Sequence, residues 1–543
     1  MSSKAVDPSS GAPPGHNLGD LRLRHHETNE IILIPTPSND PHDPLNWSAA
    51  FRYYIAVLVC LAVLLCNFLA AGPTVAIEQT TIDFLGPMGS NASAHIARVA
   101  FFYSTTSLMQ GVGMLFWMPL IIKFGRRPIY IISFVLYVAT GLWCGFAKTY
   151  SVELAGRIIM GLAAGAGECL GPLTITDIFF LHERGAAMSL YTAALSVGVA
   201  AGIIIDGLIT ISLHWRYIYY VATALIGGVT LLVIFTFPET TFDRNSALER
   251  DAASNLSVGA RTASKSAVTS EHHENAEPET LQIRKKPSYL SSLRLFNGIH
   301  TSESLFRIFL RPIVLIIIPP VLWTSLVFAV TIGFLVAITS NFATAFSTTY
   351  GFAPWQSGLC FIAGLIGSLI GITFGGQVSD WVADWLTRRN DGIRQPEMRL
   401  PSIAIGGVCA PAALVLYGVG INNNLHWIAP TIALGLLNFA IVQATNVAMV
   451  YVIDSYRPSV GEITVSILAF KAAFGFLLSF YTNPWITLEG YSKAFGEMAC
   501  IAGVIILIAV PFYYWGRAVR HRTWKWRIME KYGRWGADRD VGE

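Results

Sequence analysis

Long apolar runs separated by short polar intervals dominate the chain. A run of about 20 apolar residues is long enough to cross a bilayer as a helix. Six such runs, a long polar interval and six more runs predict an all-α membrane protein, with twelve transmembrane helices in two six-helix, pseudo-symmetric bundles. The predicted spans cover residues 52–76, 98–121, 128–147, 152–174, 187–210, 217–237, 312–337, 355–378, 400–420, 427–452, 463–486 and 496–516.

Polar segments divide the chain around these two bundles. Residues 245–286 are rich in Ser, Ala, Glu and His without apolar periodicity, which is typical of a disordered linker. Residues 288–310 carry spaced Leu and Phe, which predicts amphipathic helices on the inner leaflet. The predicted divisions are a disordered cytosolic tail at 1–50, a bundle at 51–240, a cytosolic linker with amphipathic helices at 241–311, a bundle at 312–516 and a cytosolic tail at 517–543.

Composition supports the membrane assignment and excludes other classes of protein. The chain is 53% hydrophobic and only 13% charged, with a mean hydropathy of +0.51, which excludes a soluble protein of this length. The net charge of +3 gives no reason to expect a nucleic-acid partner. All seven cysteines fall in apolar segments without C-x-x-C spacing, so we expect neither a disulfide framework nor a metal site. No cofactor is expected either.

Basic residues in the short loops predict the orientation of the chain. If both termini are cytosolic, the inner loops hold more Lys and Arg than the outer loops, as the positive-inside rule requires. The inner set is Lys123, Arg126, Arg127, Arg184, Arg388, Arg389, Arg394, Arg399 and Arg457; the outer set is Arg98, Lys148, Arg216 and Lys493. Of the N-x-S/T sequons, only Asn91 lies outside in this topology, which makes it the candidate glycosylation site.

The fourth span carries charged and small residues on one helical face. Arg157, Gly161, Gly165 and Glu168 recur at intervals of three or four residues. A charged side chain in a span costs about 2.5–3.5 kcal/mol on insertion scales, so it normally faces a protein interior or a wet cavity. Glycines beside it let a neighbouring helix approach closely.

Two of these charges have candidate partners at matching depth. Arg157 and Asp206 each lie near the outer end of their span, which suggests an ion pair. Glu168 and Lys471 lie at similar depth nearer the cytosol, which makes them candidate partners as well. Other readings stay open: a buried Glu168 could carry a proton or bind a cationic substrate, and Lys471 could extend to the interface.

Several motifs resemble the major facilitator superfamily. The fourth span reads R-x-x-x-G-x-x-x-G, and Asp177–Gly185 (DIFFLHERG) and Asp43–Ser48 (DPLNWS) resemble its fungal twelve-span drug:proton antiporter branch. The resemblance implies alternating access and a solute site near the midplane between the halves. It also implies that the cytosolic side closes by bringing spans four and five against ten and eleven, where we predict that Glu168 and Lys471 form a gate pair, and it implies a role for Arg157 in proton coupling. The candidate residues for substrate binding and proton coupling are Arg157, Glu168, Asp206, Lys471 and Asn446. Polar residues that could line that cavity are Asn67, Gln110, Asn438, Gln443, Asn446 and Asn483.

The cytosolic loops resemble the family's conformational latch. Arg126 and Arg127 end a partial loop signature after the second span, and Asp380 occupies the equivalent place after the eighth. The charged turns after the fourth and tenth spans also match in position. The resemblance therefore implies a latch made of Arg126, Arg127, Asp177, Arg184, Asp380 and Asp454.

The fifth span departs from the family's antiporter motif. Gly198 and Gly202 are correctly spaced, but Ile203 stands where the motif has proline and Asp206 where it has glycine. The main prediction is a proton-coupled exporter of a xenobiotic or secondary metabolite in the cell membrane, working as a monomer. The alternatives are proton-coupled uptake of a nutrient or polyamine, favoured by the altered motif, and a transporter-derived nutrient receptor. No Gly-Lys dipeptide occurs, which excludes a P-loop pump, and no catalytic constellation suggests an enzyme.

Overall fold

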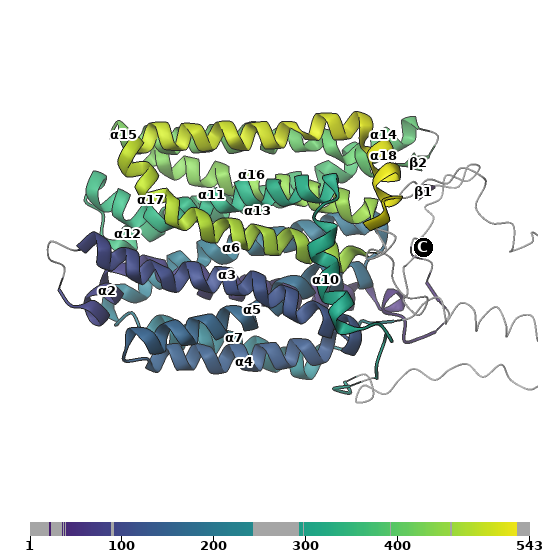
Figure 1. The fold of residues 1–543 in the computed structure, drawn as a ribbon, viewed down its shortest axis with the longest axis horizontal. Helices are drawn as coiled ribbons and strands as arrows, with labels where there is room; N and C mark the ends of the chain where they lie inside the picture. The colour runs from purple at the N-terminus through teal and green to yellow at the C-terminus, as the bar shows by residue number, and fades with distance from the viewer. Residues whose placement is uncertain are drawn as a thin grey trace, which may run out of the picture.

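The computed structural model describes residues 21–22, 35, 37–38, 40–87, 92–242, 293–296, 298–390, 392–456 and 459–528. Its long helices run side by side along one axis, with helices of the first half below and helices of the second half above (Figure 1). The basic end, on the right, has the loops at 124–126, 178–181, 389–396 and 455–460. The opposite end has the loops at 86–92, 146–150, 212–217, 350–354 and 422–428.

The first half contains one broken helix and five long helices. Its elements are η1 (Pro44–Asn46), α1 (Ala49–Ala71), η2 (Gly72–Ala76), α2 (Ile77–Leu85), α3 (Ala92–Phe124), α4 (Arg126–Phe146), α5 (Tyr150–Ile178), α6 (Leu181–Ser212) and α7 (Tyr217–Thr236). The small residues of α5 pack against α3: a Cβ at Gly161 would overlap the carbonyl of Thr106, and one at Gly165 that of Gln110. The glycine stripe of the fourth span is therefore a helix contact, as its spacing predicted.

The second half repeats this plan with more interruptions. Its elements are α10 (Leu305–Leu315), α11 (Pro319–Tyr350), α12 (Pro354–Leu359), α13 (Ile362–Thr373), the π-helical η3 (Phe374–Val378), α14 (Ser379–Arg389), β2 (Ile393–Arg394), η4 (Pro396–Ile403), α15 (Ala404–Asn422), α16 (Ile428–Ser455), α17 (Val460–Leu507) and α18 (Ala509–Trp524). The short β2 pairs antiparallel with β1 (Leu21–Arg22) from the N-terminal region.

The described part of the chain contains eleven helical stretches that are long and apolar enough to cross a membrane. The last of them, Val460–Thr523, is two crossings, because Gly490 breaks the helix with φ 78° and ψ 164°. A positive φ is accessible to glycine without a Cβ penalty. The indole of Trp485 donates to Glu497 across this turn, at 3.0 Å. The described residues therefore form the twelve crossings that the apolar runs predicted.

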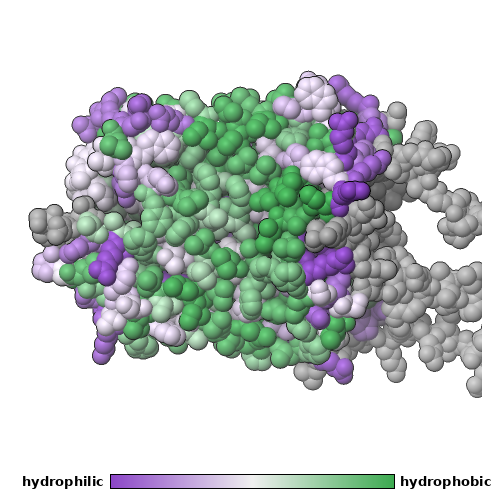
Figure 2. Space-filling model, viewed as in Figure 1, coloured by the Kyte–Doolittle hydropathy of each residue, from purple (hydrophilic) through white to green (hydrophobic). Residues whose placement is uncertain are grey.

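The surface matches an all-α membrane protein. Figure 2 shows a broad apolar band around the middle of the molecule, with hydrophilic residues at both ends. Large apolar side chains of the long helices are exposed, including Phe235 at 62%, Val408 at 71% and Val504 at 64%. Helices that expose so much apolar surface are suited to lipid rather than water.

Two boundaries differ from the sequence prediction. The seventh span begins at Pro319 rather than residue 312, because α10 ends at Leu315 and a separate helix follows. Pro319 and Pro320 start this span, since proline lacks an N–H that the first turn would leave unpaired anyway. The end of the N-terminal tail is also ordered: the Asp43 carboxylate accepts hydrogen bonds from the backbone N–H groups of Ser38 and Leu45, each at 3.0 Å.

Candidate functional site: a cavity between the two halves

A cavity lies between the two halves of the chain. It extends from the middle of the molecule toward the end that lies opposite the basic end. Its walls come from α1, η2 and α3 of the first half and from α11 and α17 of the second. Near its deep end, toward the basic end, Lys471 Nζ lies 3.0 Å from Glu168 Oε2. Asn67 Nδ2 donates to the other oxygen of Glu168, at 2.9 Å. The contact that matching depth predicted is therefore present, and it joins α5 to α17 across the two halves.

The environment of this pair suits a reversible contact. Glu168 is fully buried and Lys471 is 9% exposed. Burying two opposite charges carries a desolvation cost that their attraction offsets only with good geometry and further hydrogen bonds. Asn67 supplies one such bond, and the cavity supplies the space into which either side chain could be released. A buried ion pair of this kind at a cavity wall is suited to exchange one partner for a ligand.

The remaining lining mixes apolar side chains with neutral polar ones, which include seven Ser and Thr residues. Tyr103, Gln110 and Asn483 contribute the larger polar side chains, and Ala, Ile, Val and Met supply much of the rest. Cavities that take small organic solutes usually combine an apolar wall with a small number of orienting polar groups.

Three of the amides predicted to face this cavity serve helix packing instead. Asn446 Nδ2 donates to the Gly375 carbonyl at 2.6 Å and to the Gly185 carbonyl at 3.4 Å. Gln443 bonds the backbone of η4 and α15, and Asn438 accepts from Ser196 at 2.5 Å. Asn446 therefore lies at the contact between the halves rather than in the lining of this cavity, because the π-helical turn η3 brings a carbonyl to its amide. Its substrate or proton role stays a prediction.

Arg157 lies in a second buried cluster, toward the opposite end of the first half. Its Nε is 3.2 Å from Glu153 Oε1, one turn earlier on α5, and its Nη1 donates to the Leu69 carbonyl at 3.2 Å. Its Nη2 donates to the Tyr219 hydroxyl, which in turn donates to Glu153. Arg157, Glu153 and Tyr219 are all buried. Groups from α5, from α7 and from the end of α1 thus converge on one guanidinium.

The predicted ion pair between Arg157 and Asp206 is wrong. Asp206 is fully buried, and neither of its oxygens has a hydrogen-bond partner within the described part of the chain. Its carboxylate packs instead against Gly72, where a Cβ would overlap Asp206 Oδ2. Depth matched the two residues correctly, but the rotation of α6 turns Asp206 to the break in α1, while Glu153 meets Arg157 at the favourable i,i+4 spacing.

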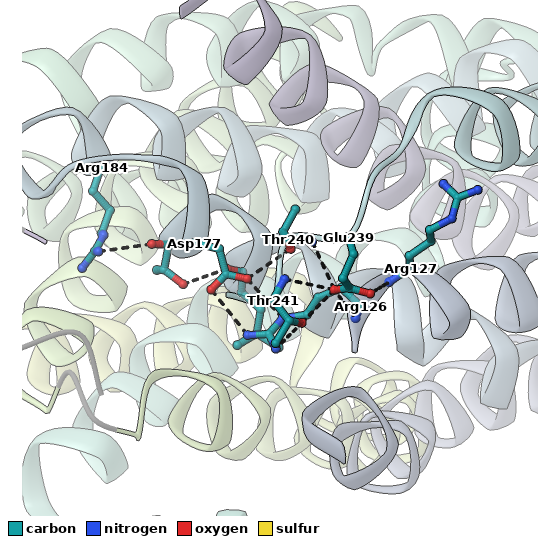
Figure 3. Close-up of polar contacts among 9 residues, drawn as sticks. Arg126, Arg127, Asp177, Arg184, Glu239, Thr240 and Thr241 are labelled. Carbon is teal, nitrogen blue, oxygen red and sulfur yellow. Dashed lines mark hydrogen bonds and ion pairs between the residues drawn. The ribbon is translucent and has the colours of Figure 1, made fainter. Parts of the chain in front are cut away.

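The predicted latch residues of the first half form one cluster at the basic end (Figure 3). Arg126 Nε lies 3.1 Å from Asp177 Oδ2. Glu239, just after α7, accepts from the backbone N–H groups of Arg126 and Arg127 at 2.9 and 3.1 Å. Arg127 also donates to the carbonyls of Ile234 and Phe237. This cluster therefore joins the loop between α3 and α4 to the ends of α5 and α7.

The other latch residues lie where the two halves meet. Arg184 Nη1 is 3.8 Å from Asp454 Oδ1, a contact between α6 and α16. Asp380 Oδ1 lies 2.7 Å from Arg399, and its carboxylate would overlap a Cβ at Gly185. Burial, reinforced by the neighbouring charge of Arg399, lowers the pKa of Arg394, which lies 3.6 Å from Asp380. At the basic end the halves are in direct contact.

Sequence reasoning missed several members of these clusters. Glu153 could have been found from its E-x-x-x-R spacing to Arg157, and Glu239 from its place in a polar turn directly after the sixth span. Nothing in the local sequence marks Tyr219 as their partner. The same is true of the buried contacts that Arg311 makes with Glu462 at 2.9 Å and with Glu303. The candidate glycosylation site Asn91 and the linker at 245–286 lie outside the described residues.

Comparison with known proteins gives consistent matches over most of the chain. The family model described as "Major Facilitator Superfamily" matches residues 57–462. An uncharacterized MFS-type transporter of Schizosaccharomyces pombe is 26% identical, over 93% of this chain and 90% of its own. The efflux pump vrtL of Penicillium aethiopicum is 25% identical, over 91% and 90%.

Solved structures show the same fold. The proton:xylose symporter XylE aligns with a TM-score of 0.58 and 16% identity, covering 86% of this chain and 97% of its own. The human organic anion transporter MFSD10 aligns with a TM-score of 0.54 and 14% identity, covering 84% and 99%.

Proposed function

Because the chain belongs to the major facilitator superfamily and is a transporter of that type, we propose that it exports a small organic solute by proton-coupled alternating access. The solute is a xenobiotic or a secondary metabolite, and the protein works in the cell membrane with both termini in the cytosol. The fungal relative named an efflux pump supports the direction of transport.

The contact between Glu168 and Lys471 is the observation that carries this proposal. It is an ion pair between the two halves, at the wall of the cavity that separates them. In alternating access, a solute binds between the halves and each half then moves relative to the other. A cationic group on the solute would take the place of Lys471 at Glu168, which would loosen one contact between the halves.

The contacts at the basic end support a defined state in this cycle. Arg184 and Asp454, and Asn446 and Gly185, hold the halves together there, while the cavity extends the other way. With the basic end in the cytosol, as the loop charges predict, this conformation faces outward. It is the state from which an exporter releases its solute and takes up a proton.

Uptake of a nutrient or polyamine is the alternative, and Asp206 favours it. The helix-packing part of the fifth-span motif is intact, because a Cβ at Gly198 would overlap the Leu64 carbonyl of α1 and one at Gly202 that of Phe68. The changes lie in the later part of the motif, where Ile203 stands in place of proline and Asp206 in place of glycine. A buried acid added at this position could carry the coupled proton in place of another residue. It would also suit transport of the solute in the direction opposite to export.

Transport by the purified full chain in proteoliposomes, under an imposed pH gradient, tests the proposal. The solutes are tetraphenylphosphonium, spermidine and a panel of lipophilic drugs and metabolites. We expect solute to move against the proton flux, and Glu168→Gln to lower the rate at least about tenfold, as loss of one charged hydrogen bond would. Glu489→Gln, at the opposite end and outside the cavity lining, is the matched control and should transport normally. Solute moving with the protons would support uptake instead.

A further inference from the structure

Asp206 is the one carboxylate of the buried cluster toward the opposite end that has no partner among the described residues. Its side chain is fully buried, and both oxygens lack a hydrogen bond. No ion pair reaches it within 4.0 Å in the described part of the chain. An ionised carboxylate in such a place would lack both solvent and counter-ion, which is strongly unfavourable.

The charged and titratable groups around Asp206 do not supply that counter-ion. The charged and titratable groups near it are Arg157 of α5 and Tyr103 of α3. Arg157 already serves Glu153, the Tyr219 hydroxyl and the Leu69 carbonyl. The single positive charge of the cluster is thus matched by Glu153, and a second negative charge on Asp206 would be unmatched.

Asp206 also lies close to the cavity, next to the broken segment of α1 that forms part of its wall. The carboxylate packs on Gly72 at the start of η2, the segment that breaks α1 at Gly72 and Pro73. Ala71 and Thr74, on either side of this break, line the cavity. The Tyr103 hydroxyl holds the break by donating to the Pro73 carbonyl, at 3.0 Å. One layer of backbone therefore separates the carboxyl group from the cavity.

We propose that Asp206 is the site that binds and releases the coupled proton, and that it is a neutral acid in the conformation described. A shift of the broken segment of α1 would expose the carboxyl group to the cavity. Its O–H bond would then break, the proton would pass to water in the cavity, and the new carboxylate would be stabilised by that water. This inference rests on the proton coupling of the proposed function, but not on the direction of transport or the identity of the solute.

Infrared spectroscopy of the full-length protein in detergent tests the protonation directly. The wild-type minus Asp206→Asn difference spectrum at neutral pH should contain the carbonyl stretch of a carboxylic acid. The matched control is Glu153→Gln, whose difference spectrum should contain carboxylate bands, because Glu153 is paired with Arg157. Carboxylate bands in the Asp206→Asn difference would overturn the proposal. This result needs no substrate, so it is independent of the transport assay.

Transport measurements then test the role in coupling. With whichever panel solute the wild type moves, Asp206→Asn should keep solute exchange at equal pH on both sides and lose the acceleration by a pH gradient. Asp206→Glu, which keeps the acid, should retain part of that acceleration. If Asp206→Asn keeps the full gradient effect, the proton is carried elsewhere. If the wild type itself shows no gradient effect while the carboxylic-acid band is present, the proposed coupling fails but the protonation of Asp206 stands.

Discussion

The two halves share one helical plan but bury different polar chemistry toward the opposite end. In the first half, Glu153, Arg157 and Asp206 are all fully buried, with Tyr219 between them. In the second half the comparable region holds a neutral network, in which Asn341 donates to Asn483 at 2.7 Å and accepts from Tyr491 at 2.5 Å.

At the basic end the halves are more alike. In each half a glutamate ties the last helix to the loops: Glu239, which is half-buried, follows α7 and holds the loop before α4, and the buried Glu397 of η4 accepts from Arg520 of α18 at 2.8 Å. Buried ionisable groups within spans are expensive and usually functional. The difference between the halves therefore suggests that the first half responds to protons and the second half provides a neutral counterpart. Five substitutions test this comparison.

Arg157→Met should have the largest effect. It leaves Glu153 buried without a counter-ion, which costs about 3–5 kcal/mol when a buried pair loses one partner. We expect a large fall in the thermal unfolding temperature of the detergent-solubilised protein. Arg157→Lys, which keeps the charge but not the three hydrogen bonds, should lie between Arg157→Met and the wild type. An Arg157→Met protein as stable as the wild type would mean that the cluster contributes little.

Glu239→Ala should come next, because it removes an acceptor shared by the backbone of Arg126 and Arg127. Hydrogen bonds to a charged group contribute about 1.5–3 kcal/mol. Glu397→Ala is the counterpart in the second half, and the thermal unfolding temperature should fall by a similar amount in both variants. If one variant lost much more stability than the other, the two glutamates would share a position in their halves but not a structural role.

Gly72→Ala tests the packing of Asp206 against the broken helix. The new Cβ would overlap the carboxyl group, and overpacking a tight site typically costs about 1–3 kcal/mol. Gly228→Ala is the matched control, since nothing lies within 4 Å of a Cβ there. We expect a lower unfolding temperature only for Gly72→Ala; equal behaviour of the two variants would contradict the close approach.

Asn341→Ala removes the centre of the neutral network in the second half. Polar contacts between membrane helices average about 0.6 kcal/mol and reach about 1.7 kcal/mol, so the loss of stability should be small. The pH dependence of transport should be unchanged, because no titrating acid is removed. A shifted pH profile would mean that the second half also takes part in proton coupling.

Lys493→Ala should have the smallest effect. Its side chain is 64% exposed, and it pairs with Glu489 at 3.1 Å on the surface. Exposed pairs contribute about 0–1 kcal/mol and are weakened by salt. We expect the unfolding temperature and the transport rate to match the wild type in physiological salt, which makes this variant the baseline for the other four.

Much of the fold followed from the sequence because each span must be long and apolar by itself. The spans near 128–147 and 217–237 differ from α4 and α7 by at most two residues at either boundary. The glycine face of the fourth span and the depth of Glu168 and Lys471 were also readable, since a helix has a fixed rise and period. These features depend on one segment, or on the level of a residue within the membrane.

Only the tertiary structure decided which side chains meet. Depth alone could not distinguish Asp206 from Glu153 as the partner of Arg157, because the rotation of each helix is set by its packing against several others. Asn446 was assigned to the cavity for the same reason, whereas η3 provides it with a carbonyl. Segment length and polarity are local properties of the sequence, but helix rotation and backbone breaks depend on contacts between distant segments. That is why the sequence identified Arg157 and Asp206 but missed Glu153, and only the packed structure separated the paired acid from the unpaired one.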